Sequence, residues 1–138
     1  MRVLFDTNIL LDALLAREPF VADAAFLLEA VESRRIEGFI SATTLTDLYY
    51  LVRRHTKSTE TATIAVTHLL ALMEICVVDR QVLEQAISLK LADFEDAVQI
   101  ACAIASSLEV IVTRDLSGFS GSPILALSPE NSRTQLMS

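Results

Sequence analysis

The chain has little glycine, proline, cysteine or histidine, and no tryptophan. Three glycines and three prolines among 138 residues exclude collagen-like and disordered compositions. The two cysteines, Cys76 and Cys102, are too few for a disulfide scaffold and lack metal-ligand spacing, so we expect buried thiols in a reducing cytosol. The chain also lacks an uncharged apolar run long enough to span a bilayer, and its first residues predict a strand rather than a signal peptide. We therefore expect a cytoplasmic protein with no membrane partner.

Positive charge is also scarce, since 11 Lys and Arg stand against 18 Asp and Glu, giving a formal net charge of −7. Nucleic-acid binding usually needs clustered cations, so this balance argues against such a partner. Two features weaken the objection. Carboxylates that hold a metal ion are no longer free negative charges, and the basic residues are bunched, at Arg34 and Arg35 and across residues 53–57. The acidic balance therefore does not exclude a nucleic-acid substrate.

Apolar residues make up 52% of the chain, in strand-like and helix-like patterns that alternate. They predict strands at residues 2–5, 39–40, 75–78, 109–113 and 124–127, and helices at 8–16, 19–30, 43–55, 58–73, 79–87 and 93–107. Pro19 is expected in the first turn of its helix, and Gly38 as a break before the second strand. The strands are short apolar runs, which is typical of a sheet covered on both faces. We predict a single domain over residues 1–138 of the α/β class: a three-layer α/β/α sandwich with a short, mostly parallel sheet.

Four aspartates, Asp6, Asp47, Asp96 and Asp115, lie far apart in the sequence, and three of them stand where a strand ends or a helix begins. In an open parallel sheet, ligands bind beyond the carboxyl ends of the strands. Carboxylates gathered there repel one another unless a divalent cation holds them. The positions therefore predict a metal site, and such a site points to phosphoester chemistry.

Asp6, Thr7 and Asn8 form the most informative single motif, because they follow a buried strand directly. The simpler interpretation is that Asp6 only caps the helix that begins near Asn8. A cap accounts for one of the three side chains. The triplet supplies a carboxylate, a hydroxyl and an amide at one strand end, which is more than a cap needs.

Asp93 and Asp96 lie on one face at the start of a predicted helix, where acids also suit the helix dipole. Capping accounts for Asp93, and the dipole accounts for Glu95. Asp96 stands next to the apolar stripe that continues through Ile100. We therefore expect its carboxylate to face the sheet edge, where it needs a cation or a donor.

Thr113, Arg114 and Asp115 end a strand of β-branched residues. A solvated turn would explain Asp115 alone, but a second parallel strand would then end in an acid beside Asp6. We expect the Thr113 hydroxyl to reach the acids, and Arg114 to point away from them or to clamp a phosphate. Asp47 is the weakest candidate, because the polar face of its helix is equally typical of a solvated surface.

These motifs, in this order, resemble the PIN domain family, and especially the single-domain toxins of bacterial VapBC-type toxin–antitoxin pairs. The resemblance extends over essentially the whole chain and rests on residues 3–8, 93–97 and 111–119. It implies that Asp6, Asp96 and Asp115 are metal ligands, directly or through water, and that Asp47 is a further catalytic acid. The family usually has a glutamate as its second acid, so Asp47, one methylene shorter, departs from the pattern.

The resemblance implies Mg²⁺ or Mn²⁺ as the cofactor, RNA as the substrate and an antitoxin protein as a partner. Three side chains are expected to support the carboxylates from behind, namely Asn8, Thr113 and Asp93. The candidates for contacts with RNA phosphates are Arg53, Arg54, Lys57 and Arg114. The first three of these also suit a solvated, dipole-matched helix end.

Two other functions compete with a ribonuclease. One is a PIN-like RNA- or protein-binding module that Asp47 and the acidic surface leave catalytically weak or inactive. The other is a phosphoryl-accepting receiver domain, which needs a paired acid before the phosphorylated aspartate and a lysine near the fifth strand. The chain lacks the first, and its Lys90 lies on a predicted helix. We also expect a homodimer, because the helices at 10–16, 48–52 and 64–73 carry more apolar surface than a small sheet covers.

Overall fold

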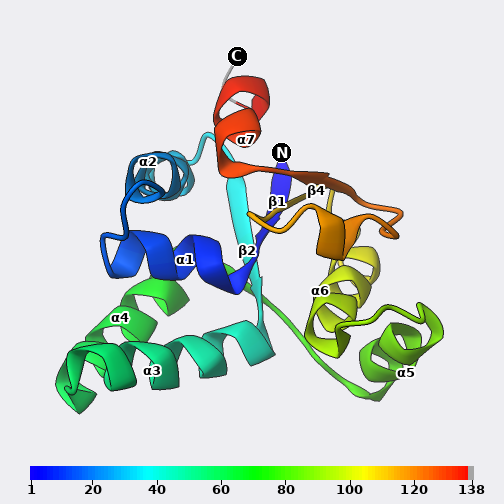
Figure 1. Cartoon of the computed structure of the whole chain (residues 1–138), viewed down its shortest axis with the longest axis horizontal. Coiled ribbons are helices and arrows are strands. Elements are labelled where there is room, and N and C mark those ends of the chain that lie inside the picture. Colours follow the sequence, from blue (N-terminus) through cyan, green and yellow to red (C-terminus); the bar gives the residue numbers. More distant parts are fainter. Residues whose placement is uncertain (137–138) are drawn as a thin grey trace.

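A central sheet of five parallel strands organises the computed structural model, which describes residues 1–136. The strands are β1 (Arg2–Phe5), β2 (Glu37–Ser41), β3 (Glu74–Cys76), β4 (Val110–Val112) and β5 (Leu125–Leu127), in the spatial order β3-β2-β1-β4-β5. Every neighbouring pair runs parallel, so the described sheet is more regular than the mostly parallel one predicted. The predicted α/β class and its three layers are confirmed (Figure 1).

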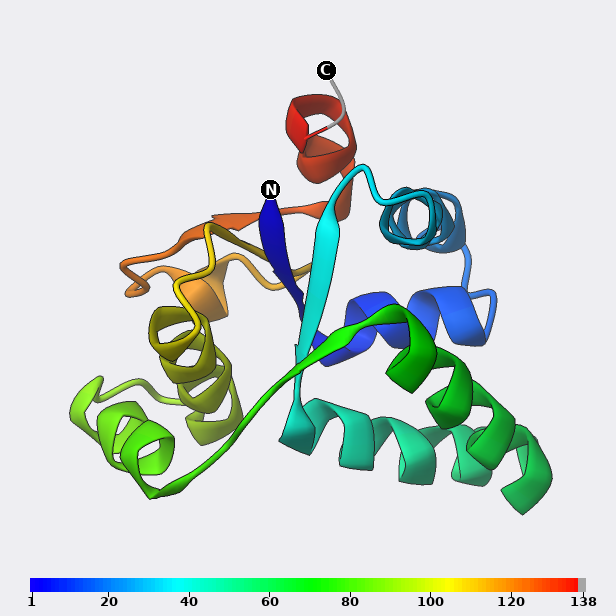
Figure 2. The ribbon, with the colours of Figure 1, turned by 180° about the vertical axis from the view of Figure 1, so that it is seen from behind.

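Helices cover both faces of this sheet, as the front and back views show (Figures 1 and 2). On one side lie α1 (Thr7–Leu14), α2 (Val21–Glu32), α3 (Ala42–Thr56) and α4 (Thr59–Leu72), and on the other α5 (Arg80–Ser88) and α6 (Phe94–Ala105). The side chains of β1 alternate between two cores. Val3 and Phe5 belong to the core with Leu48 of α3, whereas Leu4 belongs to the core with Ile100 of α6. The central strand therefore ties both helical layers to one sheet.

The register between β1 and β4 brings two polar residues side by side at the carboxyl edge of the sheet. Phe5 is aligned with Val112, and the Asp6 amide N–H donates to the Val112 carbonyl at 3.0 Å. The next residues along, Asp6 and Thr113, must then be neighbours. This edge is where ligands bind in open α/β sheets.

Four details of the fold differ from the sequence-based expectations. Pro19 precedes α2 instead of standing in its first turn, because residues 17–20 form a turn whose Arg17 carbonyl accepts from Val21 at 2.7 Å. Gly38 is not a break but lies inside β2. The position requires glycine because a Cβ there would stand 2.5 Å from the Met73 sulfur at the end of α4. The third strand ends at Cys76, two residues early. A further helix, α7 (Pro129–Leu136), packs against α2 and was not expected.

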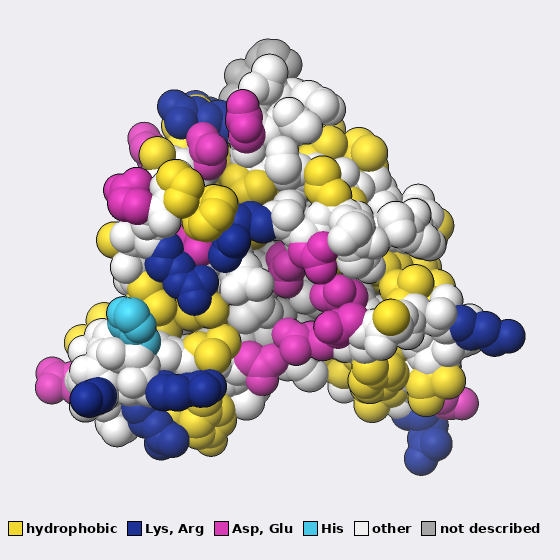
Figure 3. Space-filling model, in the orientation of Figure 1, with side chains coloured by type: hydrophobic (Ala, Val, Ile, Leu, Met, Phe, Trp, Pro, Cys, Tyr) yellow, Lys and Arg dark blue, Asp and Glu magenta, His cyan; other side chains and the backbone are white. Residues whose placement is uncertain are grey.

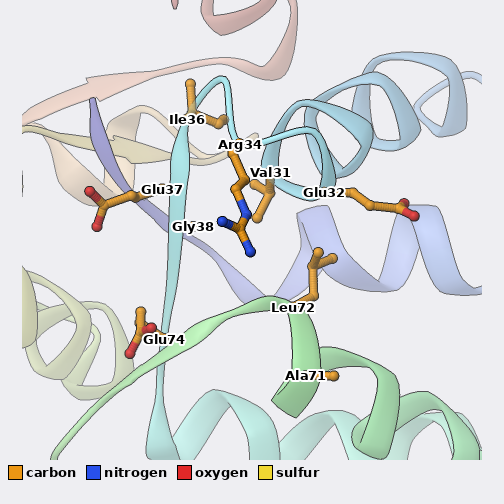
Figure 4. Close-up of a pocket in the computed structure, with 9 residues that line it drawn as sticks. All are labelled: Val31, Glu32, Arg34, Ile36, Glu37, Gly38, Ala71, Leu72 and Glu74. Atoms are coloured by element: carbon orange, nitrogen blue, oxygen red, sulfur yellow. The ribbon is translucent and has the colours of Figure 1, made fainter.

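Other general expectations can be checked on the described residues. Cys76 and Cys102 are both free and buried, as predicted. No helix within residues 1–136 is both long and apolar enough to cross a bilayer. A hollow of about 580 Å³ lies at the amino ends of β2 and β3, beside Arg34, Glu37 and Glu74 (Figure 4). It is at the opposite end of the strands from the predicted acids and holds none of them.

Candidate active site

Asp6 is the most firmly held acid of the site. It is buried and caps α1, and its Oδ1 accepts from the Thr7 amide at 2.7 Å and from Gln99 Nε2 at 2.8 Å. Its Oδ2 accepts from the Thr113 hydroxyl at 2.8 Å. Both carboxylate oxygens are thus fixed by donors from α1, α6 and the end of β4, which leaves the group one orientation. Thr113 lies where the sequence predicted it.

Asp96 and Asp115 approach each other over Gly118. A Cβ at Gly118 would stand 2.7 Å from Asp96 Oδ2 and 2.6 Å from Asp115 Oδ2, so the missing side chain leaves space between the two carboxylates. Asp115 is fixed by its own loop, because its Oδ1 accepts from Ser117 Oγ at 2.9 Å and from the Gly118 amide at 3.1 Å. Asp93 caps α6 by accepting from the Asp96 amide at 3.1 Å, and so supports Asp96 through the backbone.

The acids repel one another strongly. The pKa of Asp96 is raised to about 7, first by its partial burial and then by the neighbouring charges of Asp93, Asp6, Asp115 and Glu95. Like charges in a partly desolvated site disfavour ionisation unless a cation balances them. The charges of Asp6 and Asp115 therefore act on Asp96 at the carboxyl edge of the sheet, and their sharing of one metal ion stays a prediction.

Asp47 and Glu95 form the other side of the same acidic region. Partial burial raises the pKa of Glu95, with further contributions from Asp47, Asp93 and Asp6, while a hydrogen bond with Thr7 opposes the shift. Glu95 had been assigned only to the helix dipole, and that interpretation was incomplete, because the side chain faces Asp47 across the cleft. Figure 3 shows Asp and Glu side chains in a band across the middle of this face, with basic side chains to one side toward α3.

The three basic candidates on α3 differ in their surroundings. Arg54 lines a hollow of about 290 Å³ together with Asp47 and Glu95, and Arg53 lies over the Tyr50 ring at 5.0 Å. Lys57 is the C-cap of the same helix.

Arg114 and Asn8 are placed outside the group of acids. Arg114 is engaged by the fully buried Asp12, with its Nε 2.8 Å from Asp12 Oδ2, and it lies 3.9 Å over the Phe20 ring. Its guanidinium therefore points away from the acids, one of the two orientations expected. Asn8 is exposed on α1, and within residues 1–136 its side chain has no hydrogen bond to a carboxylate of the site.

Three residues that shape the site were not singled out from the sequence. Gln99 is almost fully buried, donates to Asp6 and leaves its Oε1 without a partner among the described residues. Gly118 provides the space between two carboxylates, although only its place in the motif had been noted. Asp12 is fully buried. A signal existed for Gln99, since a lone amide within an apolar helical run needs a polar partner.

The residues present fit a hard divalent cation. Gly118 leaves a cradle between Asp96 and Asp115 that a Cβ would fill, and the oxygens that line it belong to their carboxylates, which suit Mg²⁺ and Mn²⁺. Within residues 1–136, no three acidic, His or Cys side chains already converge as ligands of one ion. An ion held at the cradle would therefore bind some of its protein ligands through retained waters, as Mg²⁺ commonly does.

The fold and the site together define an α/β protein with an acidic cleft at the carboxyl edge of a parallel sheet. The chain belongs to the PIN domain family, whose profile matches residues 2–117. Members of this family are nucleases, and the chain shares their fold.

Solved structures with the same fold include several toxin–antitoxin proteins. A chain from Rickettsia felis VapBC2, bound to a DNA fragment of its promoter, matches with a TM-score of 0.69 and 19% identity over 93% of this chain and 98% of that one. A toxin–antitoxin complex from Klebsiella pneumoniae matches with a TM-score of 0.68 and 25% identity over 92% and 97%. Mycobacterium tuberculosis VapC20, a toxin that cleaves the sarcin–ricin loop, matches with a TM-score of 0.65 and 17% identity over 79% and 86%. No curated protein matches the sequence.

Proposed function

We propose that this protein is a metal-dependent endoribonuclease and the toxin of a toxin–antitoxin pair. The single observation that carries the proposal is the convergence of Asp96 and Asp115 over Gly118, beside an Asp6 whose two oxygens are held by three donors. A structural role would not require this convergence, because unpaired carboxylates brought together destabilise the fold.

The roles of the acids follow from how each is held. Asp96 and Asp115 flank the cradle and would hold Mg²⁺ or Mn²⁺, with Asp6 reaching it directly or through water. When bound, such an ion lowers the pKa of a water nucleophile and neutralises charge on the phosphate. Asp6 cannot turn away from the cleft, because Gln99 and Thr113 fix its two oxygens. Asp47 would orient a water from the α3 side, where Glu95 faces it.

The RNA backbone would lie toward the basic end of α3. Arg54 shares a hollow with Asp47 and Glu95, so a phosphate contact there is next to the acids. Arg53 and Lys57 stand further along the same helix and would contact neighbouring phosphates. The Arg114 contact proposed from the sequence is the least supported, because Asp12 already binds that guanidinium.

The toxin assignment rests on the solved structures that share this fold. Similar structures include VapBC complexes from Rickettsia felis and Salmonella typhimurium, both bound to DNA, and one from Haemophilus influenzae. An antitoxin protein is therefore the partner we propose, and RNA the substrate.

An inactive RNA- or protein-binding module is the second candidate, favoured by two observations. Asp47 is shorter than the glutamate expected there, and in residues 1–136 no three ligand side chains are already assembled around a point. The two functions differ in their response to metal. Millimolar Mn²⁺ raises the melting temperature of a protein that binds it only when folded, and an unchanged melting temperature would favour the inactive module.

Growth and cleavage assays test the proposal directly. Induction of the wild-type protein should arrest growth, and purified protein should cleave total RNA with Mn²⁺ but not after chelation by EDTA. Asp6→Asn and Asp96→Asn should abolish both effects. Equal toxicity and equal cleavage by all three proteins would remove the nuclease function.

A further inference from the structure

The hollow beside Asp47 has features that the acidic cleft alone does not explain. It measures about 290 Å³ and is lined by Thr7, Asp47, Tyr50, Leu51, Arg54 and Glu95. We propose that it is a nucleotide subsite for single-stranded RNA, in which one base stacks on Tyr50 and its phosphate pairs with Arg54. This inference rests on the proposed ribonuclease function and names the residues that select an unpaired strand.

The spacing along α3 aligns the parts of the subsite. Asp47, Tyr50 and Arg54 are separated by three and four residues, so they follow one another along a single helix face. The stripe begins at an acid of the proposed metal site and ends at a cation. A strand that crosses it would meet the ring between the cleft and the positive charge.

Tyr50 is an exposed aromatic ring whose position is already fixed. Its relative exposure is 52%, so a large part of the side chain is accessible to a ligand. The Tyr49 ring meets it edge-on with centroids 5.1 Å apart, and the Arg53 guanidinium lies 5.0 Å from its centroid. A ring held in this way loses little conformational entropy when a base stacks on it. Stacking on aromatic side chains is the usual way in which proteins bind unpaired bases.

Arg54, unlike Arg17 and Arg114, has no acidic partner among the described residues, and unlike its neighbour Arg53 it is not stacked on a tyrosine ring there. Arg17 and Arg114 pair with Asp12, whereas within residues 1–136 no carboxylate lies at ion-pair distance from Arg54. Its charge is therefore available to a phosphate. A basic peptide would be attracted by Asp47 and Glu95 but repelled by Arg54, and a polyanion with a bound cation at the acids satisfies both ends of the hollow.

The size and exposure of the subsite favour a single strand over a duplex. In double-stranded RNA the bases are stacked on one another and their faces are not available to a side chain. A duplex would offer Tyr50 only backbone. An unpaired strand offers a base face at each nucleotide, so the subsite would restrict cleavage to loops and unpaired segments.

Binding measurements on a cleavage-deficient protein test the subsite. In an Asp96→Asn background, we would measure anisotropy of a fluorescent 12-nucleotide RNA of random sequence, and of the same length of abasic RNA. Tyr50→Ala should weaken binding of the base-containing strand by about 5- to 100-fold and leave binding of the abasic strand unchanged. Tyr50→Phe should bind as the parent does, because it keeps the ring. Arg54→Ala should weaken binding of both strands.

Matched controls separate the subsite from general surface effects. Ile87 is also exposed, at 66%, but lies on α5, so Ile87→Ala should not change binding. Arg80→Ala on α5 serves in the same way for Arg54. Thermal melting of each variant establishes that it is folded, and unlabelled RNA duplex should compete poorly with the labelled strand.

The outcomes for the subsite and for the nuclease are distinguishable. If wild-type protein cleaves RNA and Tyr50→Ala binds it as tightly as the parent, the subsite is overturned and the nuclease stands. If wild-type protein cleaves no RNA but binding depends on Tyr50 and on the bases, the nuclease is overturned and the subsite stands. The subsite would also be overturned if Tyr50→Ala weakened binding of the base-containing and abasic strands equally, or if the duplex bound more tightly than the single strand.

Discussion

At the scale of single residues, the site is defined by charges placed where they oppose folding. Asp96 is flanked by four other acids, and its pKa is raised from 3.8 to about 7 by partial burial first and by those charges second. Acids that destabilise the fold in this way are more typical of a functional site than of a structural one. The loss of stability can be measured, because it depends on pH and on metal.

Asp96→Asn should stabilise the metal-free protein above neutral pH. Because the folded-state pKa of Asp96 is raised, folding takes up a proton between pH 3.8 and about 7, and this contribution to stability is lost as the pH rises through that range. The amide does not titrate, so the variant should melt at a higher temperature than wild type in EDTA at pH 8, with a smaller difference at pH 4. Its melting temperature should no longer respond to Mn²⁺. Glu84→Gln on α5 is the control, and a Mn²⁺ response retained by Asp96→Asn would contradict the assignment.

Gly118→Ala should damage the proposed metal site and leave the fold almost intact. The added methyl group would stand 2.6–2.7 Å from oxygens of Asp115 and Asp96, which must then separate. We expect the apparent affinity for Mn²⁺, measured by titration of cleavage activity, to fall about 10- to 100-fold. Gly121→Ala is a matched control, because its Cβ would meet only a Leu91 methyl group at 3.1 Å. Equal effects of the two substitutions would mean that the cradle has no special role.

At the scale of elements, the loop after β4 is anchored from behind by an ion pair. Arg114 reaches across to Asp12 of α1, at 2.8 Å, while the next residue, Asp115, turns into the cleft. Asp12 is fully buried and also lies 3.4 Å from Arg17. The pair thus connects α1 to the segment that carries Asp115 and Gly118.

Asp12→Ala should therefore cost far more than the loss of a surface ion pair. Asp12→Ala removes the shared partner of Arg114 and Arg17, whose side chains keep partial contact with solvent at 29% and 38% exposure, and we expect a loss of about 1.5–3 kcal/mol in the free energy of unfolding, measured by urea denaturation. The control is Asp23→Ala, which breaks the pair between Asp23 and Arg133, both partly exposed, and should cost about 0–1 kcal/mol. Similar losses for the two variants would show that the Asp12 pair does not anchor the loop.

The alternation of elements and the acids at strand ends could be predicted from the sequence for a simple physical reason. Buried parallel strands require continuous apolar runs, and the polar residues that follow them must lie at one edge of the sheet. This rule places Asp6 and Asp115, whereas Asp96 is placed by its position in the first turn of α6. The Asp93 cap was predicted correctly because capping depends on a neighbour three residues away.

What the sequence could not predict depends on contacts across the fold. Gln99 donates to an acid 93 residues away, and the space at Gly118 exists only because α6 brings Asp96 to it. Gly38 was predicted to be a break before the second strand, but glycine is required there for another reason. A Cβ at this position would clash with the Met73 sulfur, which belongs to a different part of the fold. The helix α7 lacks a strong apolar stripe, and its residues are ordered by packing against α2. Contacts between residues that lie far apart in the chain leave no local sequence pattern from which they could be predicted.

At the scale of the whole molecule, charge and apolar surface are unevenly distributed. The net charge of −7 is concentrated in part in the cleft, where a bound cation would offset it. Large apolar side chains remain exposed, among them Ile64 on α4 and Ile87 on α5, at 62% and 66%. Side chains of this size on two helices outside the cleft are more than a small isolated domain needs to expose.

We predict that the protein is a homodimer through the α4 side, where the sequence placed surplus apolar residues at 64–73. Light scattering coupled to size exclusion at micromolar concentration should then give twice the chain mass of 15.1 kDa. Ile64→Lys should convert the dimer to monomer, because a desolvated charge opposes a closed interface. Ile87→Lys, at a similarly exposed position on the opposite layer, should leave it intact. Dissociation by Ile87→Lys alone would move the interface to α5, and a monomeric wild-type protein would exclude the homodimer. The cleft lies at the edge of the sheet between the two helical layers, so an interface on α4 would leave it open to RNA.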